Sequence, residues 1–589
     1  MPTLNWIGKQ AVIEHHTQVP FHLLKTNADL SLLPHTGQLP VGEGVGAGNL
    51  LVQGDNLLAL KALLPQYASR VKCIYIDPPY NTGNENWVYN DAVNSPEMRA
   101  WLGKTVGGEA EDLSRHDKWL CMMYPRLMLL KEFLRDDGVI FISIDNNELS
   151  HLELLMSEIF GEHNNVGTLI WKNATDNNPT NITVEHEYVL CYALNKQRLP
   201  KEWKAVSLPI KERMLKIGTE FVVGYKDRVE RQAAYTKWYR QRRPFIWPFQ
   251  DYKFIDDEGI YTGSRSVHNP GKEGYRYDVL HPNGLPCTQP LMGYRFPEET
   301  MRALLADNRI LFGEDETKLI ELKLYVKDYR AKLSSLFELD GRVGTNEIKA
   351  LFPDNKRPFN FPKPTGLISE LLSFTTQGTD IILDSFAGSG TTGHAVMQLN
   401  AEDGGDRRFI LVEMDETICR DITAQRLKRA AAKIAVEHAP AGLVESAQPS
   451  LLPDTPEPPA PNLRFGFTYC ELGEPLFGPD GDIRPSVTWD DLAAHVFFAE
   501  TGTPLMRLPA WLKPLAGIAN GTAVYLLYNG VLKDKRPNTG NVLTSAVLAE
   551  LPPHAGPKVI FGTGCRLSPA RLQALGITFR QIPYEVRIS

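Results

Sequence analysis

A short acidic and aromatic stretch, Asp77-Pro78-Pro79-Tyr80, follows an apolar run at residues 71–76. The run is mostly β-branched or aromatic and predicts a buried strand, which the two prolines prevent from continuing. A carboxylate, a rigid turn and an aromatic ring therefore stand at the carboxyl edge of a strand, where open α/β sheets hold their ligands. Asp77 and the Pro78 carbonyl can accept both hydrogens of an exocyclic amine while Tyr80 stacks on the attached ring. The simpler interpretation is a Pro-Pro turn that only closes a strand.

A second motif, Gly-Ser-Gly-Thr-Thr-Gly at residues 388–393, follows a predicted strand at 380–384. It matches the glycine pattern of dinucleotide-binding folds, and Glu413 lies about 20 residues further on, where a ribose-binding acid is expected. A hydride-transferring enzyme is therefore one interpretation. Phe386, however, offers a ring for a flat adenine, and a dehydrogenase has no use for the amine-binding motif on another strand. The two motifs together favour an enzyme that acts on an amine.

Alternating strands and helices must position these motifs. Further strands are predicted at 50–52, 139–144 and 409–413, with helices between them, and 168–171 and 187–193 are expected to form an antiparallel pair. The alternation predicts an α/β fold with a doubly wound, largely parallel sheet.

Length and composition set the limits of this interpretation. A chain of 589 residues is too long for one core and predicts three or four domains. No apolar run is long enough to span a bilayer, and seven cysteines without a close CxxC pair favour reduced thiols in a cytoplasmic protein. The net charge is -7, yet residues 195–360 carry about 30 Lys and Arg against about 23 Asp and Glu. This asymmetry favours one nucleic-acid-binding domain.

Changes in pattern along the chain predict six segments. They are an N-terminal arm (1–49), a first core part (50–195), a basic insert (196–357), a second core part (358–438), a proline-rich linker (439–462) and a C-terminal α/β accessory domain (463–589).

The insert contains a strongly basic stretch at residues 226–243, with seven basic and two acidic side chains and interleaved aromatic rings. Basic side chains suit phosphates and aromatic rings suit bases, so this stretch is the predicted DNA contact. The alternative is a solvated helix whose aromatic face packs on its own core. An amphipathic helix is expected at 318–337. The predicted DNA-binding residues are Arg228, Arg231, Lys237, Arg240, Arg242 and Arg243.

The two motifs together resemble those of the amino-group DNA methyltransferases, which use S-adenosylmethionine. The order of the motifs, with the insert between them, is similar to the β class, and residues 77–83 (DPPYNTG) resemble the modification subunits of type III restriction systems. The resemblance implies a Rossmann-like methyltransferase core with an inserted target-recognition domain. It also implies a cofactor site formed by Asp55, Lys363, Asp384, Phe386, Gly388, Ser389, Gly390, Thr391, Thr392 and Glu413.

Within this site the resemblance implies that Glu413 binds the ribose, that Asp55 contacts the adenine edge, and that Lys363 lies beside the methionine end of the cofactor. Asp55 also has the position of a helix N-cap, which explains it without a ligand. Asp77, Pro78, Pro79 and Tyr80 are the implied catalytic residues, acting on a flipped adenine.

Several alternatives stay open at this level. N4 methylation of cytosine uses the same amine chemistry, and the same fold can also serve as a catalytically silent DNA-binding protein or act on RNA. Methylation at cytosine C5 needs a Pro-Cys nucleophile, but Pro286-Cys287 lies in the insert, away from both motifs. The resemblance further implies duplex DNA as substrate, a homodimer, and a separate restriction or helicase subunit. No metal site is expected.

Overall fold

The computed structural model describes residues 3–32, 48–82, 103–104, 114–174, 181–205, 209–243, 246, 249–269, 271–329, 331–438, 465–478, 480–503, 505, 512–529 and 540–582. They divide into two compact units. The first comprises Met1–Lys201 and Ser334–Ser589, and the second comprises Glu202–Leu333. Among the described residues no helix is both long and apolar enough to cross a membrane.

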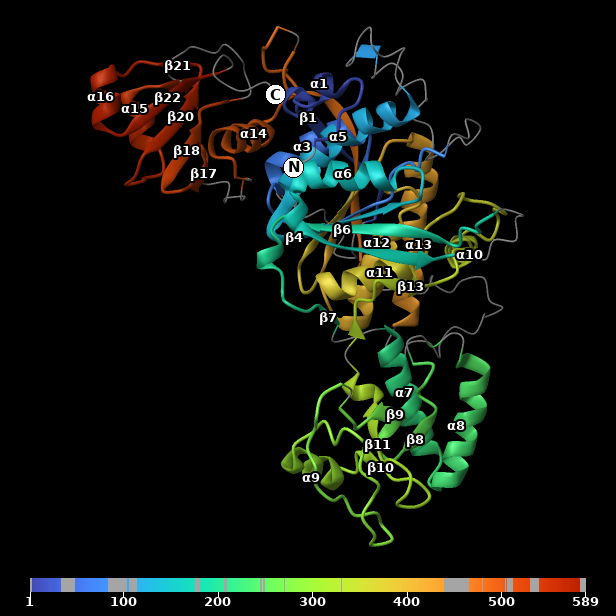
Figure 1. The fold of residues 1–589 in the computed structure, drawn as a ribbon. Helices are drawn as coiled ribbons and strands as arrows, with labels where there is room; N and C mark the ends of the chain where they lie inside the picture. The colour runs from blue at the N-terminus through green and yellow to red at the C-terminus, as the bar shows by residue number, and fades with distance from the viewer. Residues whose placement is uncertain are drawn as a thin grey trace, which may run out of the picture. The chain divides into compact units, whose positions relative to one another are not determined.

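A ten-stranded sheet forms the core of the first unit (Figure 1). Six neighbouring strands, from β16 to β4, run parallel, and β6 pairs antiparallel with both β4 and β5. In spatial order the strands are β1 (His22–Leu32), β16 (Phe467–Pro475), β2 (Leu50–Gln53), β15 (Arg408–Glu413), β14 (Ile381–Asp384), β3 (Val71–Ile76), β4 (Leu134–Ile144), β6 (His186–Ala193), β5 (Asn165–Lys172) and β13 (Leu336–Glu338). The predicted α/β fold with a parallel sheet and an antiparallel pair is confirmed.

Helices cover both faces of this sheet, because its central strands carry apolar side chains on both sides. On β3, Ile74 packs in the cluster that contains α3 and α5, while Cys73 accepts a hydrogen bond from Thr375 of α11 on the opposite face. The helices on the first face are α3 (Asn56–Tyr67), α5 (Arg115–Phe133) and α6 (Leu149–Phe160), and those on the second are α11 (Thr365–Thr375), α12 (Thr391–Asp403) and α13 (Ala424–Glu437). The sheet is therefore doubly wound.

One edge of the sheet differs from the sequence expectation. β16, predicted to start a separate domain, pairs parallel with β2, and β1, predicted to be part of an arm, pairs antiparallel with β16. The reason lies in β2, where Leu50, Leu51 and Val52 are all buried. Because buried backbone N–H and C=O groups need hydrogen-bond partners, β2 needs a neighbouring strand on each side, and β16 is the second one. The segments 1–49 and 463–589 thus both contribute to the core sheet.

The second unit contains the helices α7 (Pro209–Gly224), α8 (Arg228–Arg242) and α9 (Glu298–Ala306). Its four-stranded sheet has the order β10 (Ile310–Leu311), β11 (Glu321–Tyr325), β9 (Gly259–Ser266) and β8 (Phe254–Asp256). The predicted insert, 196–357, is wider than this unit, because β13 and α10 (Arg342–Leu351) belong to the first unit.

The prediction of a helix at 318–337 is wrong. This segment forms β11, β12 (Ala331–Lys332) and the start of β13. Burial alternates along β11, where Lys323 and Tyr325 point inward and their neighbours are more exposed. A period of two is the pattern of a strand in a sheet and does not fit a helix.

The C-terminal part has a four-stranded sheet of its own, ordered β17 (Leu515–Ala519), β18 (Thr522–Leu526), β20 (Lys558–Gly562) and β22 (Ile577–Gln581). The last three strands run parallel. Helix α14 (Trp489–Thr501) shares a hydrophobic cluster with this sheet and with Phe21 and Leu23 from the N-terminal region. The part is α/β, as expected.

Candidate active site

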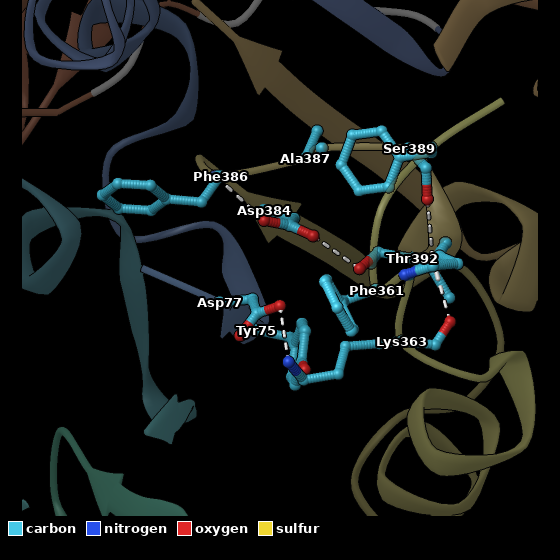
Figure 2. A pocket seen from close by; sticks show the side chains of 13 residues that line it. Tyr75, Asp77, Phe361, Lys363, Asp384, Phe386, Ala387, Ser389 and Thr392 are labelled. Carbon is cyan, nitrogen blue, oxygen red and sulfur yellow. Dashed lines mark hydrogen bonds and ion pairs between the residues drawn. The ribbon is translucent and has the colours of Figure 1, made fainter. Parts of the chain in front are cut away.

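A pocket opens at the carboxyl ends of β3 and β14, which are neighbouring strands that carry the two motifs (Figure 2). Its lining consists of Tyr75, Asp77, Phe359, Phe361, Pro362, Lys363, Asp384, Phe386, Ala387, Gly388, Ser389, Thr391 and Thr392. Motifs that are about 300 residues apart in sequence thus meet in one cavity. Pro78, Pro79 and Tyr80 continue the chain from Asp77, and Gly390 lies within the glycine loop.

The turn after β3 is held firmly. The Pro79 carbonyl accepts a hydrogen bond from the indole nitrogen of Trp119 at 2.6 Å, and the Tyr80 hydroxyl donates to Oε2 of Glu187 at 2.8 Å. Oδ1 of Asp77 is buried and, among the described residues, has no hydrogen-bond partner. A buried carboxylate oxygen of this kind is unfavourable unless a donor reaches it. The turn therefore presents an acceptor that a ligand can use.

Lys363 reaches the other carboxylate oxygen of Asp77, Oδ2, from the opposite wall of the pocket, as Figure 2 shows. Its Nζ lies 2.8 Å from Oδ2 of Asp77 and 3.4 Å from Oε2 of Glu187, and it stands 4.8 Å from the centre of the Tyr80 ring. The resemblance implied that Lys363 binds the methionine end of the cofactor, whereas in the structure its ammonium contacts the Asp77 carboxylate.

The contact between Lys363 and Asp77 shifts the pKa values of both side chains. Burial raises the pKa of Asp77, and the nearby Lys363 ammonium opposes the rise. Burial lowers the pKa of Lys363, but the carboxylates of Asp77 and Glu187 outweigh it and leave that pKa above its ordinary value. The Lys363 ammonium therefore favours the ionised form of Asp77, in which the carboxylate is a hydrogen-bond acceptor.

The glycine loop is shaped by two left-handed residues, Gly388 with φ 51° and Gly390 with φ 81°. A Cβ on Gly390 would lie 3.0 Å from the Thr423 side chain, so a larger residue would be both strained and crowded. The loop leads directly into α12, which begins at Thr391. Backbone N–H groups at such a helix start favour negatively charged ligand groups.

Arg426 of α13 holds this loop in place through hydrogen bonds to two of its hydroxyls. Its guanidinium is fully buried, and Nη1 donates to the hydroxyls of Ser389 and Thr391 at 2.7 and 2.8 Å. Burial lowers the pKa of Arg426 to about 10. The sequence analysis did not single out Arg426, because an arginine within a helix gives no sign that it will be buried.

Glu187 and Phe361 are two further residues that the sequence analysis missed. Glu187 stands at the start of an otherwise apolar strand, β6, and joins Tyr80 to Lys363. Phe361 is 61% exposed, lines the pocket and has a left-handed φ of 51°. A bulky residue in that conformation is strained, and such strain concentrates at functional sites. The charged start of β6 was the only available signal in sequence.

Asp384 ends β14 and holds the loop together. One carboxylate oxygen accepts the Phe386 N–H at 3.0 Å and the other accepts the Thr392 hydroxyl at 2.6 Å. Burial raises the pKa of Asp384 to about 7, although both hydrogen bonds oppose the rise. Asp384 therefore ties the start of the loop to the first turn of α12.

Three predicted cofactor residues, Asp55, Gly390 and Glu413, lie outside the pocket lining. Glu413 accepts the backbone N–H groups of Gly388 and Asp415, at 2.8 and 2.9 Å, and so supports the loop. Asp55 caps α3 by accepting from Leu57 and Leu58, which is the role that its sequence position also allowed. For Asp55 the structure gives the simpler explanation.

The pocket fits a molecule of the S-adenosylmethionine type. Because Gly388 has no side chain, the Phe359 ring can approach the loop backbone; a Cβ there would lie 3.3 Å from that ring. The Phe386 ring also lines the pocket, and the Ser389 and Thr391 hydroxyls offer polar partners. Oδ1 of Asp77, which has no hydrogen-bond partner among the described residues, is an acceptor in the same pocket.

The predicted DNA-binding stretch forms α8 in the second unit. Lys237, Arg240, Arg242 and Arg243 are exposed. Arg231 is buried, with its guanidinium on Asp257 at 2.8 Å and on backbone carbonyls, so it supports the unit and is not available to phosphate.

The rest of this stretch also differs from the DNA-contact prediction. Arg228 is exposed but pairs with the same carboxylate, Asp257. The aromatic rings of Tyr235, Trp238 and Tyr239 pack in the unit's own hydrophobic cluster, as the alternative interpretation held.

Comparison with known proteins gives the class of this protein. The sequence model of the DNA methylase family matches residues 71–425, which include both motifs and the insert. The chain therefore belongs to the DNA methylase family. It is a DNA methyltransferase of the amino-group type that uses S-adenosylmethionine.

Within that family the chain is similar to type III modification subunits. It is 48% identical to the EcoP15I Mod subunit of Escherichia coli, over 73% of this chain and 69% of that protein. It is 33% identical to the StyLTI Mod subunit of Salmonella typhimurium, over 68% of this chain and 60% of that protein.

A solved structure, PvuII DNA methyltransferase (cytosine-N4-specific), is 11% identical over 66% of this chain and 93% of that one. Its TM-score of 0.30 is too low to support an argument.

Proposed function

We propose that the protein methylates N6 of adenine in duplex DNA, as the modification subunit of a type III restriction-modification system. The observation that carries this proposal is the buried Oδ1 of Asp77, which has no partner among the described residues and faces a glycine loop across one pocket. Similarity to the Mod subunits of Escherichia coli and Salmonella typhimurium supports the type III assignment, and the family resemblance of the Asp-Pro-Pro-Tyr motif favours adenine.

The exocyclic amine of adenine is a poor nucleophile because its lone pair is delocalised into the ring. Asp77 and the Pro78 carbonyl accept the two amine hydrogens and so direct the lone pair out of the ring plane. S-adenosylmethionine supplies an electrophilic methyl group when it is bound. Positioning and charge complementarity account for the acceleration, without a covalent enzyme intermediate. The base must leave the duplex to reach this turn, and Tyr80 stacks on it there.

Stacking of the base on Tyr80 requires Lys363 to move. In the structure its ammonium covers the Tyr80 ring, which is the stacking contact proposed for the base, and donates to Oδ2 of Asp77, which leaves Oδ1 for the amine. Glu187, already 3.4 Å from Nζ, is the acceptor that can keep the ammonium when the amine arrives. Lys363 thus holds the Asp77 carboxylate in a hydrogen-bonded ion pair.

Methyl transfer itself tests the proposal. The full chain is incubated with S-adenosylmethionine that carries a radiolabelled methyl group and with unmodified duplex DNA, and the digested nucleosides are separated. Label in N6-methyladenine supports the proposal, and Asp77→Ala should abolish it. Label in N4-methylcytosine would keep the mechanism but refute the choice of base. Cofactor binding without any labelled nucleoside would refute the proposed activity of the isolated chain on DNA.

The exposed side chains Lys237, Arg240, Arg242 and Arg243 of the second unit are the proposed phosphate contacts. Neutralising Arg240, Arg242 and Arg243 together should weaken duplex binding and reduce the slope of log K against log salt by about 1 for each lost contact. Arg302→Ala is the matched control, because this arginine is exposed on α9 of the same unit. An equal slope in both variants would exclude this part of the helix as the interface.

The type III assignment also predicts two protein partners. We infer that the chain forms a homodimer, as the family resemblance implies, and that it binds a separate restriction subunit, because the similar proteins are Mod subunits of restriction-modification enzymes. Light scattering of the purified chain tests the first inference. Co-purification with a co-expressed restriction subunit tests the second.

A further inference from the structure

We propose that His116, Glu148 and His151 form a binding site for a divalent transition-metal ion of the Zn²⁺ type, beside the catalytic motif. The three side chains come from two helices: His116 from the first turn of α5, and Glu148 and His151 from the start of α6. Nδ1 of His116 lies 2.7 Å from Oε1 of Glu148, and Nδ1 of His151 lies 2.7 Å from Oε2. All candidate ligand atoms lie within 4.8 Å of one another.

The charge of Glu148 requires a partner. Its side chain is fully buried, and no Lys or Arg pairs with it in the part of the chain that the structure describes. A buried carboxylate is costly unless it is paired or coordinates a metal. Its described partners are two imidazoles and the side-chain amide of Asn81. A divalent ion between the imidazoles would supply the missing positive charge.

The donor set indicates which ion. Two imidazole nitrogens and one carboxylate are typical ligands of Zn²⁺ and of divalent iron, cobalt or nickel, whereas Mg²⁺ and Ca²⁺ prefer oxygen ligands alone. Glu148 and His151 are three residues apart on one helix, a spacing that brings a carboxylate and an imidazole to the same metal in helical metal sites. Zn²⁺ binds nitrogen and oxygen at about 2.0–2.2 Å. On binding, the two His–Glu pairs now at 2.7 Å would therefore separate, and the ligand atoms that are farthest apart would approach each other.

Access and proton balance are both compatible with binding. His116 and His151 are 34% and 31% exposed, so an ion can enter from solvent. A neutral imidazole that donates from Nδ1 would move its proton to Nε2 and ligate through Nδ1. At His116, Nε2 now accepts from Arg115 at 3.4 Å, and this exposed side chain would have to turn away.

The site touches the catalytic motif through Asn81. This residue follows Tyr80, is buried, and has a left-handed φ of 56°. Its amide donates to Glu148 and to the Arg115 carbonyl. Hydrogen bonds that orient a ligating carboxylate are a usual part of metal sites. A bound ion would therefore fix Glu148, and Glu148 would fix the strained turn after the amine-binding motif.

Binding is tested without DNA or S-adenosylmethionine, so its outcome is independent of the proposed methyl transfer. The full chain is stripped with a chelator, incubated with Zn²⁺, desalted and analysed for metal content. Co²⁺ gives a second readout, because nitrogen and oxygen ligation in a closed site produces visible absorption bands. We expect one equivalent of Zn²⁺ per chain and a higher melting temperature in its presence.

Variants separate a metal site from a hydrogen-bond network. His151→Asn keeps a donor for Glu148 but removes a good ligand, so it should fold and lose Zn²⁺ affinity by about 100-fold. His116→Ala should do the same. His163→Ala, an exposed histidine just after α6, is the matched control and should retain the ion. Less than 0.1 equivalent in the unmodified chain, or equal binding in His151→Asn and His163→Ala, would overturn the proposal.

Discussion

The ends of β3 and β14 lie side by side, and each carries an aspartate in the pocket, yet the two aspartates are held in opposite ways. Asp77 contacts the ammonium of Lys363, whereas the partners of Asp384 among the described residues are a hydroxyl and a backbone N–H. Burial acts on both, but the cation at Asp77 opposes it, and Asp384 reaches a pKa of about 7. The comparison shows that neighbours decide whether such a carboxylate serves as a charged acceptor or as a loop support.

The largest expected effect is on catalysis. Asp77→Asn replaces one acceptor with a donor that the amine cannot use, so methyl transfer should fall by about 10³-fold. Asp384→Asn retains an acceptor for the Phe386 N–H and a donor for Thr392. Its loss should stay within about tenfold and show mainly as weaker cofactor binding. Single-turnover rates measured over a range of cofactor concentrations give both the maximal rate and the cofactor affinity. Equal losses of the maximal rate in the two variants would contradict the distinction between the two aspartates.

A second prediction concerns the pH dependence of methyl transfer. Asp77 must be ionised to accept the amine hydrogens, so the rate falls as the pH drops through its pKa, which burial raises. Lys363→Met removes the cation that opposes this rise, and the acid limb of the pH–rate profile should therefore shift to higher pH.

Lys363→Arg is the control for this shift. It keeps the positive charge and should leave the acid limb near its original position. A limb that is unchanged in Lys363→Met would mean that the ion pair with Asp77 is absent in the working enzyme.

The smallest effect is on stability. A carboxyl group whose folded pKa is about 7 binds its proton more tightly in the folded state than in the unfolded state. Its contribution to the free energy of unfolding is therefore lost as the pH rises from about 4 to 7, by at most roughly 4 kcal/mol. Asp384→Asn removes this term. Urea unfolding measures the free energy of unfolding at pH 5.5 and at pH 8. Between these two pH values it should decrease less for the variant than for the unmodified protein, and equal decreases would contradict the raised pKa of Asp384.

The parts of the site that could be predicted from sequence are those in which consecutive residues dictate the geometry. The two prolines end β3 at Asp77, and Gly388 and Gly390 allow the left-handed loop before α12. Contacts between distant residues gave no such signal. Lys363 and Glu187 meet Asp77 and Tyr80 only because β6 and the segment before α11 converge on the same strand end.

The same distinction between local sequence signals and contacts of distant residues holds for the fold. Apolar runs identified the central strands, since burial on both faces leaves a plain pattern. The partners of β2 came from remote segments, and the alternating burial of β11 was masked by charged side chains such as Lys323, which is buried and pairs with Asp256. In α8, composition alone could not show that Arg231 would turn inward to Asp257.

The pairing of β16 with β2 and β1 has a practical consequence for dissecting the molecule. A truncation after α13, at the proline-rich segment that sequence suggests as a boundary, would remove β16 and leave two hydrogen-bonding edges open, one on β2 and one on β1. Open edges recruit other chains and promote aggregation. A fragment meant to carry the catalytic core alone would therefore need residues up to Pro475, or a designed strand in their place.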